Sequence, residues 1–184
     1  NKTEGIWLGP DRNSDNSYCG INWTDGPVRC LGIYIGYNKD ACQTLNWNNR
    51  IKKMQNIIDI WKTRNLTIFG KITLLKSLVC SKIIFPAMLL PIPKPIPNLI
   101  NQMLYGFVWH KKDRVTRTCL ISKYINGGLN MIDIKCKFHS LKIGWVKRLL
   151  EGLQANWTCV FSQYLRKLSL NAHDFFQMNF RSEA

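Results

Sequence analysis

Short apolar runs alternate with polar turns over the first 36 residues, a pattern typical of a small antiparallel sheet. TEGIWLG, residues 3–9, predicts a strand, and residues 10–18 predict a polar loop. CGINW and VRCLGIYIG flank TDGP, so we expect a β-hairpin whose turn is supplied by Asp25 and Gly26. Pro27 limits strand pairing just after that turn because proline lacks a backbone N–H.

The spacing of apolar residues changes to threes and fours near Ala41, which predicts an α-helix that continues to about Trp61. Either Asn38 or Asp40 is a candidate N-cap, since both side chains accept hydrogen bonds from free backbone N–H groups. The polar face of this helix is predicted to carry the cations Arg50, Lys52, Lys53 and Lys62.

A second helix is predicted from about Lys71 to Phe85, where Pro86 would end or kink it. PIPKPIP, residues 91–97, is expected to be extended and stiff, as in polyproline II. The apolar stripe of the second helix is predicted to contain Ile72, Leu75, Leu78, Val79 and Ile83.

Three further helices are predicted over residues 98–109, 133–153 and 156–168. A basic loop, HKKDRVTR, follows the first of these, and TCLISKY after it fits either a strand or a turn of helix. Gly127 and Gly128 predict a tight turn with a positive φ, and a less favoured reading is a close approach of the backbone to a ligand. The fold class is therefore expected to be α+β, a short N-terminal antiparallel β-hairpin or sheet followed by a mostly α-helical bundle.

The charge of the chain is strongly one-sided. Lys and Arg number 26 against 11 Asp and Glu, a formal net charge of +15. The excess lies in two blocks, +7 over residues 50–82 and +8 over residues 109–150, while the rest of the chain is nearly neutral. Such a balance favours a polyanionic partner, because Lys and Arg release the counterions of phosphates. The alternative is a basic protein whose cations are only solvated.

Candidate catalytic chemistry is missing from the sequence. Seven Cys without a CxxC pair argue against a disulfide framework or a zinc site and favour free thiols in a reducing compartment. His110, His139 and His173 have no clustered partners, and the carboxylates form no DxD or DD pair of the kind that two-metal chemistry uses. We therefore predict no catalytic residue, no metal ligand and no cofactor in this chain, and we expect no complete enzyme.

Six segments, in order, resemble the reverse transcriptase of non-LTR (LINE-type) retrotransposons. NKTEGIWLG is similar to the strand that closes the palm, and VRCLGIYIG to the YLGI primer-grip hairpin, with Cys30 where Tyr is usual. WKTRNLTIFGKITLLKSLVCSK and the prolines after it resemble the thumb, with Lys71 where Arg is commoner. LINQMLYGFVWHKK and GGLNMIDIKCKFHSLKIGWVKRLL are similar to the segments after it, although His139 and Ser140 replace the usual Asn and Ala.

The resemblance covers about residues 1–152 and implies a division of the chain. Residues 1–40 would be the end of the palm and the primer grip, 41–110 the thumb, and 111–184 a basic loop with a C-terminal helical region. The catalytic aspartates of the palm are not matched, so we expect a piece of a longer RNA-directed DNA polymerase that does not polymerise by itself. Mg²⁺ is expected only in the missing palm, and the location is expected to be intracellular, in cytoplasm and nucleus.

The expected partners are an RNA–DNA primer–template duplex and the upstream palm domain, without a membrane. Lys2 is similar to a lysine near the palm active site, and Gly32 would let the backbone approach the primer end. Thumb and loop cations would follow the phosphates, a contact that positions the duplex without reading its sequence. The predicted nucleic-acid-binding residues are Lys2, Leu31, Gly32, Arg64, Gly70, Lys71, Lys76, Lys111, Lys112, Arg114 and Arg117.

Three other interpretations stay open on the sequence. The first is a free-standing or domesticated nucleic-acid-binding module derived from such an element. The chain also fits a basic protein that binds membranes or acidic protein surfaces, although its prolines and aromatic core argue against membrane helices. A transposon relic without function is the third.

Overall fold

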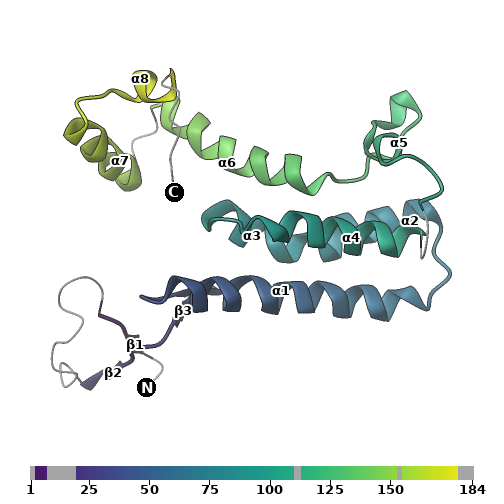
Figure 1. Cartoon of the computed structure of the whole chain (residues 1–184), viewed down its shortest axis with the longest axis horizontal. Helices are drawn as coiled ribbons and strands as arrows, with labels where there is room; N and C mark the ends of the chain where they lie inside the picture. Colours follow the sequence, from purple (N-terminus) through teal and green to yellow (C-terminus); the bar gives the residue numbers. More distant parts are fainter. Residues whose placement is uncertain (1–2, 8–19, 110–112, 153–154, 178–184) are drawn as a thin grey trace. The chain divides into compact units, whose positions relative to one another are not determined.

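The computed structural model describes residues 3–7, 20–109, 113–152 and 155–177. The fold class is α+β, as predicted, with short strands at the N-terminus followed by helices (Figure 1). The chain divides into two compact units, of which the first ends at Lys135 and the second begins at Cys136. The predicted boundaries near residues 40 and 110 both fall within the first unit.

The strands pair differently from the prediction. β1 (Glu4–Gly5) lies parallel to β2 (Asn22–Trp23), and the antiparallel hairpin consists of β3 (Val28–Cys30) and β4 (Ile33–Ile35). The predicted hairpin turn at residues 25–26 is therefore wrong, because Leu31 and Gly32 form the turn.

Backbone geometry explains the choice of turn. Leu31 has φ +49° and Gly32 has φ +79°, and a two-residue hairpin turn of type I′ requires a positive φ at both positions. Thr24 instead continues the parallel ladder by donating its N–H to Gly5 O at 2.9 Å. The N–H of Gly26 is then used locally, by a 3.1 Å bond to Thr24 Oγ1. Of the predicted first strand only residues 4–5 pair within the described residues, and the loop 10–18 lies outside them.

α1 (Lys39–Lys62) confirms the first predicted helix. The side chain of Asn38 is the N-cap and accepts the N–H of Ala41 at 3.0 Å. Trp47 and Met54 are almost fully buried on the face that packs against the neighbouring helices.

The second predicted helix is interrupted rather than continuous. It comprises α2 (Ile68–Leu74), a π-helix (Leu75–Val79) and α3 (Ser81–Leu89), with a bend of 45°. The π-helix adds a residue to the turn, which rotates Leu78 out of the predicted apolar stripe to 43% exposure. Pro86 lies inside α3 and does not end it. Within the described residues no single helix is long and apolar enough to cross a membrane, although this bent pair passes that test by length and composition.

α4 (Pro95–Trp109) starts within the segment predicted to be extended. Pro95 is the first helical residue, where a missing N–H costs nothing and the fixed φ suits the helix. α1 contacts α3 and α4, and α2 contacts α4, which gives the first unit its core (Figure 1). The apolar side chains of this core that are 1% exposed or less include Trp47, Met54, Ile72, Leu75, Val79, Ile83, Ile100 and Leu104.

Residues 117–131 form a turn region. α5 (Arg117–Ile121) shows that TCLISKY starts as helix, and a 3₁₀ turn (Tyr124–Asn126) leads to Gly127, whose φ of +73° confirms the predicted turn. The chain then pairs back on itself through Met131 N–H to Leu120 O at 2.8 Å.

The second unit holds most of α6 (Ile134–Leu150), α7 (Asn156–Lys167) and α8 (Ala172–Gln177). α6 and α7 correspond to the fourth and fifth predicted helices. Trp145 and Trp157 meet edge to face with ring centroids 5.4 Å apart. Phe161 of α7 makes the same kind of contact with Phe175 of α8 at 5.8 Å. Aromatic pairs therefore join the helices of this unit.

Burial of Cys80 leads to a first testable prediction. It raises the pKa of this thiol from 9.0 to about 12, so the thiolate is scarce at pH 8. We expect iodoacetamide at pH 8 to alkylate the exposed Cys119, Cys136 and Cys159 quickly and to spare Cys80 in the folded protein, as read by peptide mass spectrometry. The contribution of Cys80 to the free energy of unfolding is complete below pH 9 and falls as the pH rises from 9 toward 12. Equal alkylation of all these thiols would contradict this packing.

Candidate nucleic-acid interface

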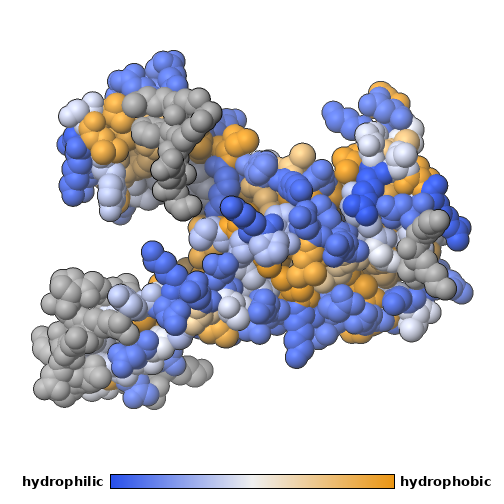
Figure 2. Space-filling view, in the orientation of Figure 1, coloured by the Kyte–Doolittle hydropathy of each residue, from blue (hydrophilic) through white to orange (hydrophobic). Residues whose placement is uncertain are grey.

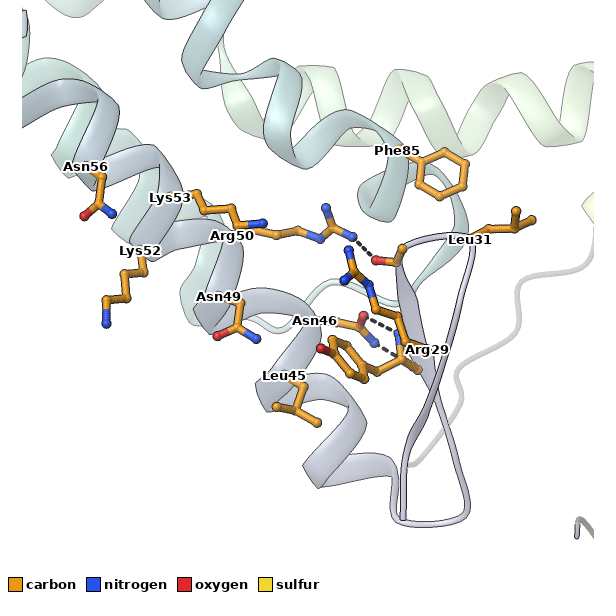
Figure 3. Close-up of a pocket in the computed structure, with 12 residues that line it drawn as sticks. Arg29, Leu31, Leu45, Asn46, Asn49, Arg50, Lys52, Lys53, Asn56 and Phe85 are labelled. Carbon is orange, nitrogen blue, oxygen red and sulfur yellow. Dashed lines mark hydrogen bonds between the residues drawn. The ribbon is translucent and has the colours of Figure 1, made fainter. Parts of the chain in front are cut away.

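A strongly basic concave surface of the first unit lies between the β3–β4 hairpin and α1. It is a groove of about 390 Å³, and Figure 3 shows the side chains of both elements around it. Among the residues that the structure describes, its lining contains four cations, three Asn and no carboxylate. We call this surface the basic groove. It is lined by Arg29, Leu31, Gly32, Tyr34, Leu45, Asn46, Asn49, Arg50, Lys52, Lys53, Asn56 and Phe85.

Helical spacing explains why α1 provides so much of this lining. Asn46, Asn49, Arg50 and Lys53 follow one another at intervals of three, one and three, so they lie along one face of the helix. On the face shown in Figure 2, hydrophilic residues cover most of the surface of the first unit, with hydrophobic patches between them. The basic groove therefore combines a helix face with the end of a hairpin.

Asn46 fixes the hairpin to α1. Its side chain is 3% exposed, and its amide makes two bonds with the backbone of Tyr34, drawn as dashed lines in Figure 3. Oδ1 accepts the N–H of Tyr34 at 2.8 Å, and Nδ2 donates to the carbonyl of Tyr34, also at 2.8 Å. One side chain thus imitates a neighbouring strand and satisfies both backbone groups of a residue in β4.

Arg50 joins the hairpin turn to α3. One guanidinium N–H donates to the carbonyl of Gly32, and another donates to the carbonyl of Lys82 at 3.3 Å. Pro86 has no N–H to offer the carbonyl four residues before it, so Arg50 supplies the bond that Lys82 would otherwise lose. Burial lowers the pKa of Arg50, and the charge of Arg29 lowers it further. Arg50 is therefore mainly a structural cation of the groove.

Arg29, Lys52 and Lys53 are the exposed cations of the basic groove. No carboxylate among the described lining residues offsets their charges. A concave surface of one sign concentrates the electric field and attracts anions of the opposite charge. The neighbouring Asn49 and Asn56 offer amide groups that both donate and accept hydrogen bonds. This arrangement suits an anionic group such as a phosphate.

Two predicted site residues, Leu31 and Gly32, lie in the lining of the basic groove. They form the tip of the hairpin, where Leu31 is 87% exposed. A Cβ on Gly32 would meet nothing within 4 Å, so the space beside its backbone is open.

The two predicted thumb lysines are held by backbone carbonyls. Lys71 Nζ donates to Val108 O at 3.1 Å, and Lys76 Nζ donates to Asn130 O at 2.9 Å. Both ammonium groups therefore have a structural role, which the sequence did not predict.

The other predicted residues lie outside the lining of the basic groove, as far as the structure describes them. Gly70 lies in α2, where its N–H is capped by Thr67 Oγ1 at 3.2 Å. Arg64 lies over the ring of Trp61, with 4.6 Å between guanidinium carbon and ring centroid. Arg117 forms an ion pair with Asp113 at 3.0 Å and lies over the ring of Tyr105. Arg114 is exposed, and Lys2, Lys111 and Lys112 lie outside the described residues.

Sequence reasoning missed most of the basic groove. It placed Arg50, Lys52 and Lys53 on the polar face of the first helix but did not assign them to a site. The role of Asn46 was not predicted. Its side chain lies between the apolar Leu45 and Trp47, where an amide indicates a buried hydrogen-bonding role. The available signal was the run NWNNRIKK, residues 46–53, which is rich in amides and cations and contains no acid.

No model of a known protein family matches the chain. Among the described residues, no three His, Cys, Asp or Glu side chains are grouped so that they would hold a metal ion.

Proposed function

We propose that this chain is the primer grip and thumb of a non-LTR retrotransposon reverse transcriptase, and that it holds the RNA–DNA primer–template duplex. The observation that carries the proposal is the basic groove, whose described lining residues include no acid and which lies beside the hairpin that resembles the primer grip. The ordered resemblance of six sequence segments supports the same assignment. The chain does not polymerise by itself under this proposal, because it matches none of the palm aspartates.

Under this proposal the residues of the groove have two roles, one structural and one in binding. Asn46 and Arg50 make the hydrogen bonds that set the hairpin against α1. The exposed Arg29, Lys52 and Lys53 are then free to meet phosphates along the duplex backbone. Such contacts position the duplex without reading its sequence, as a polymerase that copies any template requires.

The test is the binding of the full chain to a fluorescent RNA–DNA hybrid, measured by anisotropy at about 50 mM and about 200 mM salt. If the chain makes several phosphate contacts, the affinity should fall by orders of magnitude as the salt concentration rises over this range. Double-stranded DNA and single-stranded RNA of the same sequence show whether the hybrid is preferred. Weak binding to all three, without salt dependence, would reject the proposal.

A double variant, Lys52→Ala with Lys53→Ala, tests whether the groove makes the contacts. We expect roughly ten- to a hundredfold weaker binding at about 100 mM salt and a salt slope reduced by about 2. The matched control, Arg166→Ala with Lys167→Ala on α7, removes the same charge from a nearly neutral part of the chain. Equal losses in the two variants would mean that net charge alone attracts the duplex, and an unchanged groove variant would remove the groove from the interface.

A further inference from the structure

A second cavity, distinct from the basic groove, lies where α2 meets the end of α4. It measures about 200 Å³, and its described lining residues include two cations and no carboxylate. The lining residues are Ile68, Lys71, Val108, Trp109 and Arg114. The set Lys71, Trp109 and Arg114 is called the junction site below.

The two cations of the junction site lie close enough to affect each other. Burial lowers the pKa of Lys71, and the charge of Arg114 lowers it further. Lys71 also donates to Val108 O at 3.1 Å, close to the C-terminal end of α4. That bond fixes the ammonium group at the cavity wall, while Arg114 stays exposed. Two like charges at one cavity favour an anion between them.

Trp109 adds an unused hydrogen-bond donor. Its indole Nε1 is buried and has no hydrogen-bond partner among the described residues. An indole N–H donates and cannot accept, so only an acceptor atom satisfies it. A buried donor without a partner is costly, and native proteins keep few of them. An incoming oxygen atom would remove that cost.

We propose that the junction site binds a phosphate group, with Arg114 and the indole N–H of Trp109 donating to its oxygens and Lys71 adding positive charge. A phosphate group suits this lining, because its oxygens can accept from Arg114 and Trp109 while its negative charge interacts with Lys71. The phosphate belongs either to a nucleic-acid backbone or to a free ion. Its assignment to the duplex backbone depends on the proposed function, whereas the anion site itself does not.

Two-dimensional ¹H–¹⁵N NMR of the tryptophan indoles tests this inference directly. The full chain has seven Trp, and a Trp109→Phe variant identifies the Trp109 signal by its loss. We expect that signal to move progressively and saturably when an RNA–DNA hybrid is added, and inorganic phosphate serves as the second probe. Arg114→Gln should weaken binding of the hybrid roughly fivefold and lower the salt slope by about 1, whereas Arg166→Gln on α7 should do neither.

The outcomes separate the two proposals. A Trp109 signal that moves with the hybrid supports a backbone phosphate, and one that moves only with inorganic phosphate, while the hybrid fails to bind, supports a free-phosphate site and rejects the proposed function. If the hybrid binds but the signal stays and Arg114→Gln binds like the parent chain, the junction site is overturned and the proposed function stands. If neither probe moves the signal and the hybrid does not bind, both are rejected.

Discussion

Replacing Asn46 by Ala is expected to lower the free energy of unfolding of the first unit by about 2–4 kcal/mol. The amide is buried and makes two 2.8 Å bonds to the backbone of Tyr34, so its removal leaves a donor and an acceptor unpaired. The hairpin should also separate from α1, because these bonds join the two elements. Urea unfolding followed by circular dichroism measures the first effect, and hydrogen exchange of the Tyr34 amide measures the second.

Asn49→Ala is the matched control for this prediction. Asn49 lies on the same helix less than one turn from Asn46 and is exposed, so we expect a change within about 0.5 kcal/mol. Asn46→Ala should in addition weaken binding of the RNA–DNA hybrid, since the basic groove needs the hairpin in place. If both variants lose the same stability, or if the Tyr34 amide stays protected without Asn46, the two bonds do not hold the hairpin.

Helices were predictable here because their signals are local. The period of three to four residues and the cap at Asn38 lie within a few positions of each other, and α1 follows both. The interruption before α3 was not predictable in the same way. A π-helix depends on which face the surrounding core accepts, and nothing between Leu75 and Val79 departs from ordinary helical sequence.

Strand pairing was harder to predict because it depends on residues far apart in the chain. The Asp25–Gly26 pair has the better local turn signal, yet the hairpin turns at Leu31–Gly32. The partner that decides the outcome is Asn46, which lies 12 positions from Tyr34 and satisfies its backbone. A register set by a side chain on another element cannot be read from the strands alone.

The candidate site shows the same limit. Charge patterning located the polar face of α1, but the groove exists only because the hairpin lies against that face. Lys71 and Lys76 were assigned to nucleic acid from a resemblance, and both also bond to backbone carbonyls in distant segments. In the sequence, a lysine that donates to the end of a helix or to a turn cannot be distinguished from one that binds a phosphate.

The second large effect is expected from Gly128→Ala, at about 3 kcal/mol of lost stability. A Cβ at this position would overlap the carbonyl group of Ser122. The backbone has little room to move, because Ser122 O accepts the N–H of Asn130 at 2.8 Å and the N–H of Gly128 donates to Lys123 O at 3.1 Å. Since Asn130 O also accepts Lys76 Nζ, the change should loosen this contact as well.

Gly127→Asn provides the control, because the two neighbouring glycines are needed for different reasons. Gly127 has φ +73° and open space where a Cβ would be, and Asn tolerates that left-handed conformation, so its cost should stay at about 1 kcal/mol or less. Gly128 needs the absence of a side chain instead. Thermal unfolding of the two variants beside the parent chain separates these reasons. A smaller loss for Gly128→Ala than for Gly127→Asn would show that the backbone of Ser122 yields, and that the turn does not depend on the close approach.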